Sequence, residues 1–428
     1  MIDIELIRKN PEIVKENIKK KFQDSKLGLV DEVAKLDKEN RELKQKIDDL
    51  RAERKNKSAE IGILMKNKEL EKANEIKLLV SKINDETEVL EQKQLELDAQ
   101  IKKIMMTIPN IIDSSVPVGK DDSENVENER FGEPVVPDFE IPYHADILES
   151  FGGLDKESAG RTSGNGFYYL MGNPARIVSA MINYARDYMI NKGFIYCIPP
   201  FMIRSDVVNG VMSFAEMSAM MYKIEGEDLF LIGTSEHSMI GRYKDTILKE
   251  SDLPVRMTSY SPCFRKEVGA HGLEERGIYR VHQFEKQEMI VICKPEESMD
   301  YYNKMWSYTV EIFRNLNIPV RTLECCSGDL ADLKVKSCDV EAWSPRQQKY
   351  FEVGSCSTLG DAQSRRLGIR VKGPNGNYYP HTLNNTVLAS TRALIAFLEN
   401  NLNRDGSVTI PEALRPYLGG MEKMEKVK

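Results

Sequence analysis

Hydrophobic residues in the first hundred positions recur at alternating spacings of three and four residues, which is typical of packed α-helices. A short amphipathic stretch at 4–22 predicts one helix. Longer heptad-like runs at 33–64 and 76–104 predict two more, separated by a polar segment at 65–74. Two long helices joined by a tight turn pack antiparallel, so we predict a coiled-coil arm over residues 31–104.

The pattern changes behind a polar stretch with several prolines, which we interpret as a linker over 109–139. Amphipathic helices are predicted at 174–194, 297–316 and 386–402. Short apolar runs of the strand type occur at 229–232, 255–260, 278–284, 288–293, 319–324, 337–343 and 350–355. Short loops join most of these runs, which favours an antiparallel sheet over a doubly wound parallel one.

These elements predict an α+β chain with two folded parts, a helical domain at 1–108 and a sheet domain with packed helices at 140–428. The chain has 428 residues, which is too long for one typical core. Its length therefore agrees with the division.

Composition narrows the class of protein. Charged residues make up 30% and hydrophobic residues 41%, as in ordinary soluble proteins. No run approaches the roughly 18 apolar residues of a membrane span, and the first 22 residues mix acidic with basic side chains, so neither an anchor nor a signal peptide is predicted. The seven cysteines form no CxxC pair, which argues against a disulfide framework or a zinc ribbon and favours the cytoplasm.

Charge is distributed unevenly along the predicted arm. Residues 41–70 carry nine Lys or Arg against six Asp or Glu, whereas residues 71–100 carry four against eight. The densest basic group consists of Arg51, Arg54, Lys55 and Lys57. A solvated coiled-coil face and a contact surface for the backbone of a folded RNA explain this group equally well.

The stretch Ser261–Glu288 predicts a strand, a long charged turn and a second strand. Its charged side chains are Arg265, Glu267, Arg276, Arg280 and Glu288. Arginine forks could hold a planar, polyanionic ligand here. Cross-strand ion pairs on a solvated hairpin are the alternative, and charge alone favours that alternative.

Several separated motifs decide between these alternatives. The helix, strand and prolines of 174–200 look like class II motif 1, CFRKE with RGIYRVHQFEKQE looks like motif 2, and LNNTVLASTRALIAFLEN at 383–400 looks like motif 3. GTSE at 233–236, DVEAW at 339–343 and FEVGSCSTLGDAQSRR at 351–366 follow the pattern of one subfamily. With the long helical hairpin in front, the chain resembles seryl-tRNA synthetases, a class II aminoacyl-tRNA synthetase family, over essentially its whole length.

The resemblance implies an ATP-dependent ligase. Such an enzyme activates L-serine with ATP to seryl-adenylate and pyrophosphate, then transfers serine to the 3′ end of tRNA(Ser). The helical domain would bind tRNA, 140–428 would be the catalytic domain, and motif 1 would form a homodimer. Mg²⁺ is expected with ATP, and no zinc is expected. Selenocysteine tRNA is a candidate second substrate that the residues do not decide.

Site residues follow from motif positions. The resemblance assigns ATP binding to Arg265, Lys266, Glu267, Val281, Phe284, Glu352, Val353, Gly354, Ser355 and Arg392. It assigns serine binding to Thr234, Ser235, Glu236, Arg265, Glu288, Asn384 and Thr386, with Arg265, Glu288 and Arg392 as the catalytic group. Glu352 and Ser355 would hold Mg²⁺. The tRNA contacts would come from Arg51, Arg54, Lys55 and Lys57.

The individual roles are also implied by the resemblance. Arg265 would bridge the serine carboxylate and the α-phosphate of ATP, and Arg392 would take the γ-phosphate. For adenine, Glu267 would bind the amino group, the backbone of Val281 would contact the base, and Phe284 would stack under it. Glu288 or Glu236 would pair with the serine ammonium group.

Some positions depart from the family pattern or carry weaker predictions. Gly166 stands where many relatives have an arginine, and the sequence offers no account of it. Cys325, Cys326 and Cys356 are interpreted as buried thiols, because adjacent cysteines are poorly placed to share an ion. The turn at 268–276 is predicted to be a mobile flap near the tRNA acceptor end, with His271 as a solvated residue.

Two other functions remain as alternatives. An enzyme that activates an amino acid and loads a carrier protein would have related chemistry, but its relatives lack the long arm. A catalytically dead paralogue could use the coiled coil as an interaction surface, but the joint presence of Arg265, Glu288, Glu352 and Arg392 argues against it.

Overall fold

The computed structural model describes residues 1–267 and 276–426 and divides the chain into two compact units. The helical unit contains Ile2–Lys19 and Gln23–Pro109, and the sheet unit contains Met1, Lys20–Phe22 and Asn110–Lys428. Within the described ranges, no helix combines the length and the apolar character needed to cross a membrane. The predicted flap falls almost entirely on 268–275, outside the described residues, and so does His271.

The helical unit begins with two short helices, α1 (Ile4–Lys9) and α2 (Pro11–Lys20), instead of the single helix predicted at 4–22. Pro11 lacks a backbone N–H and disfavours a helical conformation at Asn10, whose φ and ψ are −143° and 63°. The helix therefore breaks between these two residues. A new helix starts at Pro11, where a missing N–H costs nothing.

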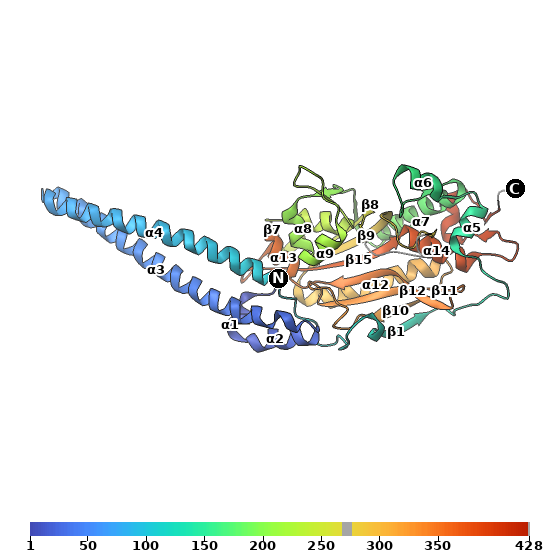
Figure 1. Cartoon of the computed structure of the whole chain (residues 1–428), viewed down its shortest axis with the longest axis horizontal. Coiled ribbons are helices and arrows are strands. Elements are labelled where there is room, and N and C mark those ends of the chain that lie inside the picture. The colour runs from blue at the N-terminus through green and yellow to red at the C-terminus, as the bar shows by residue number, and fades with distance from the viewer. Residues whose placement is uncertain (268–275, 427–428) are drawn as a thin grey trace. The chain divides into compact units, whose positions relative to one another are not determined.

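The long helices α3 (Leu27–Lys66) and α4 (Leu70–Met105) lie side by side as an antiparallel hairpin (Figure 1). Leu43, Ile47 and Leu97 are buried along their seam. Polar residues interrupt the seam, and there the Asn40 side-chain amide donates to Asp98 at 2.7 Å. The predicted coiled coil is confirmed, although the turn occupies three residues and not the whole of 65–74.

The sheet unit is built on one eight-stranded sheet in the order β1-β10-β11-β12-β15-β9-β8-β4. Its strands are β1 (Val126–Phe131), β4 (Ile195–Cys197), β8 (Val255–Phe264), β9 (Gln283–Cys293), β10 (Val320–Glu324), β11 (Lys336–Ser344), β12 (Lys349–Thr358) and β15 (His381–Ala389). Neighbours run antiparallel except β4 and β8, which are parallel. The α+β prediction is confirmed, and the sheet is mixed because of this one pair.

Shorter elements surround this sheet. The helices are α5 (His144–Ser150), α6 (Lys156–Thr162), α7 (Gly172–Asn191), α8 (Ser205–Val211), α9 (Phe214–Met220), α10 (Ser235–Gly241), α12 (Ser298–Asn315), α13 (Ala362–Leu367) and α14 (Ser390–Asn401). The small strands are β2 (Leu154–Asp155), β3 (Tyr169–Leu170), β5 (Met202–Ile203), β6 (Phe230–Leu231), β7 (Ile247–Lys249), β13 (Arg370–Gly373), β14 (Gly376–Tyr378), β16 (Val408–Thr409) and β17 (Lys423–Met424).

The two faces of the sheet differ because side chains alternate along each strand. On β9, Met289 and Val291 point into the main core, which α7, α12 and α14 cover. Lys286 and Glu288 alternate with them and point to the opposite face. There α8, α10 and α13 cover one end of the sheet. The remainder of that face carries the polar side chains of the candidate site.

Two of the predicted secondary-structure boundaries were wrong. The strand predicted at 278–284 begins only at Gln283 and continues through the strand predicted at 288–293 as one element, β9. Ile278 and Val281 looked like strand residues because they are buried in the core, but their backbone is irregular. The helix predicted at 386–402 begins at Ser390, since its first residues end β15, where Thr386 pairs with Glu288. The predicted linker also contains an ordered strand, β1, paired with β10.

Candidate active site

A cleft on the open face of the sheet gathers most of the predicted ATP residues. It is lined by Arg265, Glu267, Tyr279, Val281, Phe284, Lys286, Glu352, Val353, Gly354, Thr386, Ala389, Thr391 and Arg392. These residues come from the segment just after β8, the first half of β9, the middle of β12, the second half of β15, the start of α14 and the irregular segment before β9. Motifs that are more than a hundred residues apart in the sequence therefore share one cleft.

Arg265 follows the end of β8, where pairing with β9 places it beside Phe284. Its guanidinium carbon lies 5.3 Å from the centre of the Phe284 ring, and its Nε donates to the carbonyl of Gly233 at 3.3 Å. The backbone N–H of Arg265 donates to the carbonyl of His282 at 2.9 Å. The arginine is thus held at both its backbone and its side chain, with the aromatic ring against it.

Glu267 has a φ of +41°, in the left-handed region that non-glycine residues rarely occupy. Its carboxylate lies 3.6 Å from the guanidinium of Arg280. Strained backbone of this kind persists only where surrounding contacts impose it, and it occurs often at binding sites.

Arg392, on α14, pairs with Glu352, on β12. Its Nη1 donates to the Glu352 carboxylate at 2.9 Å and to the Glu352 carbonyl at 3.1 Å. Its guanidinium also lies 4.8 Å from the centre of the Tyr279 ring. Burial alone would raise the pKa of Glu352, but the positive charge of Arg392 outweighs it, so the pKa lies below its ordinary value. The Arg392 guanidinium therefore stabilises the ionised form of this carboxylate.

Glu288 is buried at the floor of the site and forms an ion pair with Lys286, two residues earlier on the same strand face. The hydroxyl of Thr234, the N-cap of α10, donates to Glu288 at 3.2 Å, and Lys286 lies 3.3 Å from that hydroxyl. Three predicted or neighbouring polar groups therefore form one buried network. A serine ammonium group would have to share or replace the Lys286 contact.

Glu236 lies on α10 and is held by Gln363 of α13, whose side-chain amide donates to its carboxylate at 2.9 Å. Burial, and then repulsion from Glu288, raises the pKa of Glu236 to about 7. The adjacent Ser235 is fully buried, and its hydroxyl has no hydrogen-bond partner within the described part of the chain. Glu236 is close enough to Glu288 for their charges to repel each other.

The remaining predicted residues lie on or next to the same strands. The hydroxyl of Ser355 of β12 is 3.2 Å from the hydroxyl of Ser337, and Ser355 lies opposite Asp339 of β11 in the strand register. Asn384 pairs with Ser357 on one side and Ile290 on the other. Lys266 turns away from the cleft, and its ammonium donates to the carbonyl of Ser218 at 3.4 Å. It is the predicted ATP residue with the weakest geometric support.

Comparison with known proteins agrees with this arrangement. Residues 1–112 match the Seryl-tRNA synthetase N-terminal domain, and residues 221–401 match the tRNA synthetase class II core domain (G, H, P, S and T). The serine–tRNA ligases of Methanocella arvoryzae and Methanoculleus marisnigri are 40% and 41% identical to the chain, over 99% of its length and 100% of theirs. The chain belongs to the seryl-tRNA synthetase family. It is an ATP-dependent aminoacyl-tRNA ligase.

Solved structures of this family have the same fold. A seryl-tRNA synthetase from Pyrococcus horikoshii, complexed with ATP, superposes with a TM-score of 0.93 at 39% identity, and all of both chains is covered. A cytoplasmic serine–tRNA ligase from Naegleria fowleri, in complex with AMP, gives 0.87 at 31% identity, over 100% of this chain and 99% of the other.

The structure adds residues that the motif comparison did not single out: Tyr279, His282, Lys286 and Gln363. Lys286 and His282 lie within the motif 2 sequence, so the sequence showed that they are near the site. It did not show which residues they contact. Alternation along β9 could have placed Lys286 on the face of Glu288. Gln363 could not be found this way, because its partner Glu236 is far away in the sequence.

Gly166 now has a physical explanation. Its φ is +81°, and a β-carbon there would lie 2.4 Å from the imidazole ring of His282. Its carbonyl accepts a hydrogen bond from the His282 N–H at 3.0 Å. His282 Nδ1 in turn lies 3.0 Å from the carbonyl of Arg265. An arginine at position 166 would require this chain to move His282, and glycine is what its packing admits.

The predicted tRNA residues on the arm make contacts within the arm. Arg51 pairs with Glu91 at 2.8 Å, across the hairpin, and Arg54 donates to Asn84 at 3.3 Å. Lys57 pairs with Glu60 at 3.1 Å, and all four basic residues of the group lie at the surface. Exposed pairs of this kind are weak, so they leave both alternatives for this face open.

Proposed function

We propose that this chain activates L-serine with ATP to seryl-adenylate and pyrophosphate, and then transfers serine to the 3′ end of tRNA(Ser). The observation that supports it most is the shared cleft of Arg265, Glu267, Phe284, Glu352 and Arg392, next to the buried group around Glu288. The chain thus brings together what an anionic nucleophile and an anionic phosphate need in order to meet.

The chemistry places positive charge where anions must approach. Arg265, fixed over Phe284, would neutralise both the serine carboxylate and the α-phosphate it attacks. Arg392 would hold the far end of the triphosphate. No covalent protein intermediate is required, because positioning and charge neutralisation lower the barrier. The adenine base would lie against Phe284 and the backbone of Val281, both of which line the cleft.

Mg²⁺ fits the donor set predicted for it. Glu352 is an ionised carboxylate at the cleft, and Ser355 follows on the same strand, so the two would supply the hard oxygens that this ion prefers. When bound, the ion would neutralise phosphate charge.

Serine recognition would rest on the buried polar groups beside this cleft. Glu288 and Glu236 would accept from the ammonium group, and Thr234, Asn384 and Thr386 would surround the hydroxyl. A buried pocket built to hydrogen-bond a hydroxyl disfavours alanine, because each unpaired group costs about 1–3 kcal/mol.

The arm would supply tRNA binding. The helices stay in contact at the level where Asn40 donates to Asp98, so deletion of 41–95 and closure with a short turn should preserve the base of the hairpin. Serine-dependent ATP–pyrophosphate exchange should survive this deletion, and charging of tRNA(Ser) should be lost. Loss of both activities would mean that the arm is structural. The same charging assay with selenocysteine tRNA tests that second substrate.

Two outcomes of these assays separate the alternatives. Exchange without any tRNA charging by the full chain would favour the carrier-loading enzyme. Neither activity would favour a catalytically dead paralogue. The match to the family's tRNA-binding N-terminal domain supports charging.

A homodimer through the motif 1 region is part of the proposal. β4 is an edge strand of the sheet. Ile195 on this strand and Ile198 just after it are 67% and 71% exposed. An unpaired, apolar edge is a surface that proteins ordinarily cover. Light scattering should give twice the chain mass, and an Ile198→Asp variant should give the monomer mass.

A further inference from the structure

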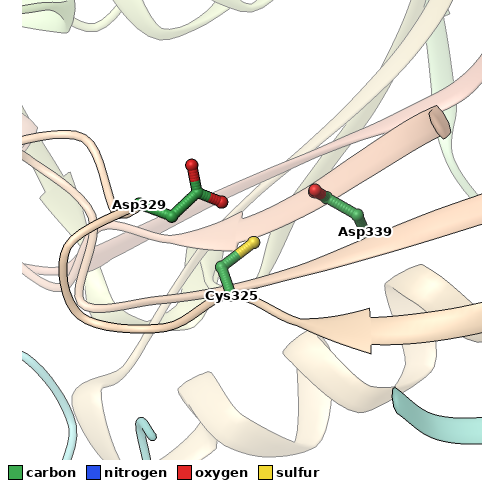
Figure 2. A group of neighbouring side chains, drawn as sticks. All are labelled: Cys325, Asp329 and Asp339. Carbon is green, nitrogen blue, oxygen red and sulfur yellow. The ribbon is translucent and has the colours of Figure 1, made fainter. Parts of the chain in front are cut away.

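A group of potential metal ligands lies outside the cleft, on the same face of the sheet. The thiol of Cys325 and the carboxylates of Asp329 and Asp339 all lie within 4.8 Å of one another. Figure 2 shows the three side chains converging on one space from the end of β10, the turn after it and β11. Within the described part of the chain, no other group of three such side chains comes this close together.

Backbone contacts fix the positions of the three residues. Cys325 continues the β10–β11 ladder, because its N–H donates to the carbonyl of Ser337 at 3.0 Å. Asp329 lies in a turn in which its own backbone N–H donates a hydrogen bond to the carbonyl of Cys326 at 3.1 Å. Asp339 is fixed by its place in the middle of β11, opposite Ser355. The convergence is therefore a property of the strand register and not of one flexible side chain.

Asp329 also has an outer partner. The side-chain amide of Asn125 donates to its carboxylate at 2.9 Å. Metal-binding carboxylates are usually oriented by hydrogen bonds of this type from a surrounding shell. Asn125 is not itself a member of the group.

One ammonium group already lies near these three side chains. It belongs to Lys334, which interacts electrostatically with Asp339 and Cys325 and donates to the hydroxyl of Ser337 at 3.2 Å. Glu352 on the neighbouring strand is paired with Arg392 and is not part of the group. Lys334 is therefore the cation with which an added metal ion would compete.

We propose that Cys325, Asp329 and Asp339 form a binding site for a borderline divalent cation of the zinc type. A thiolate beside two carboxylates suits zinc better than the harder Mg²⁺. Zinc bonds of about 2.0–2.3 Å place ligand atoms roughly 3.3–3.8 Å apart, so small side-chain rotations would close the site. This donor set differs from the adjacent Cys325–Cys326 pair and is separate from the serine pocket.

Metal binding by the purified full-length chain tests the proposal without measuring aminoacylation. After dialysis against a chelator, zinc affinity is measured by competition with a chromophoric chelator, and cobalt is added to detect a near-ultraviolet thiolate–cobalt band. The wild type should bind one zinc per chain and show the band. Cys325→Ser should lose the band and bind zinc at least about tenfold more weakly.

Cys326→Ser is the matched control, because the Cys326 thiol donates instead to the carbonyl of Asp121 at 3.1 Å. It should keep both the affinity and the band. Asp329→Asn changes an exposed side chain and should fold normally, yet it should also weaken zinc binding. If Lys334 is the only cation this group holds, the wild type will bind no zinc, and that result overturns the proposal. Equal losses in Cys325→Ser and Cys326→Ser would overturn it too.

Discussion

The side-chain amide of Gln363 donates to the carboxylate of Glu236 at 2.9 Å across 127 positions of sequence. Gln363 is itself held in one orientation, because its carbonyl oxygen accepts from Thr382 at 2.7 Å while its amide also donates to the carbonyl of Val211 at 3.2 Å. A buried glutamine with both ends occupied cannot rotate freely. It therefore determines where the Glu236 carboxylate points.

Replacing this amide should affect serine more than ATP. Gln363→Leu removes a hydrogen bond to a buried carboxylate, which is worth about 1.5–3 kcal/mol, so the KM for serine in the exchange reaction should rise at least about tenfold. The KM for ATP should change little. Thr382→Val, which only frees the amide to rotate, should give a smaller rise.

Gln347→Leu serves as the control, because Gln347 is exposed on the loop after β11. It should leave both constants unchanged. Equal rises of the serine and ATP constants in Gln363→Leu would indicate a general loss of structure instead of a role in orienting Glu236.

The raised pKa of Glu236 predicts a pH-dependent cost in stability. A carboxyl whose pKa rises from an ordinary 4.5 to about 7 on folding binds protons more tightly when folded, so its stability contribution is present below about pH 4.5 and is lost as the pH rises to 7. Glu236→Gln removes the charge. Relative to the wild type, the free energy of unfolding of the variant should increase progressively between these pH values, by up to about 3 kcal/mol above pH 7. Urea unfolding at pH 5, 6, 7 and 8 measures this gain, and a pH-independent difference would contradict it.

Much of this site could be predicted from the sequence, because the motifs keep their residues at fixed spacings on single strands. Alternation along β9 places Phe284 and Glu288 on one face whatever the rest of the chain does. Contacts between distant segments could not be predicted. Lys286 looks like an ordinary strand lysine until the fold buries it beside Glu288 and Thr234.

The prediction of strand and helix boundaries was wrong for a related reason. Ile278 and Val281 are apolar because the core needs them, and burial in an irregular segment leaves the same pattern as burial in a strand. The break at Pro11 was visible as a proline, but the spacing of apolar residues around it continued as in one helix. The spacing of apolar residues shows which positions are buried. Whether a segment is a helix, a strand or irregular depends on its backbone hydrogen bonds.

The buried pair of Lys286 and Glu288 should be costly to break from one side. Lys286→Met leaves the Glu288 carboxylate buried without its cation, which should destabilise the protein by about 3–5 kcal/mol. The double variant Lys286→Met/Glu288→Gln should recover part of that loss, because no uncompensated charge remains. Denaturant unfolding measures both.

Lys423→Met provides the matched comparison, because Lys423 pairs with Asp405 at 2.8 Å on the surface. Its effect should stay within about 1 kcal/mol. If Lys286→Met costs no more than Lys423→Met, Lys286 does not balance the Glu288 charge.

Arg392 should control both ATP use and the ionisation of Glu352. Arg392→Met removes a planar cation from the phosphate end of the cleft, and the exchange rate should fall by about 10²–10³-fold. Arg392→Lys should recover little, since lysine cannot reproduce the paired contacts to the Glu352 carboxylate and carbonyl. Arg404→Met, at an exposed ion pair with Asp138, should leave exchange unchanged. An equal loss in Arg404→Met would point to net charge and not to the site.

Gly166 and Gly226 offer a matched test of packing against His282. Both have left-handed φ angles, +81° and +79°, but a β-carbon at Gly166 would lie 2.4 Å from the His282 ring, whereas nothing lies within 4 Å of one at Gly226. Gly226→Ala should cost only the backbone term, about 1 kcal/mol. Gly166→Ala should cost more, and it should raise the KM for ATP because His282 fixes the backbone of Arg265. His282→Ala removes the ring that the new β-carbon meets, so in that background the two alanine substitutions should cost the same. A Gly166→Ala cost that stays higher without the imidazole would show that the strain lies in the backbone alone.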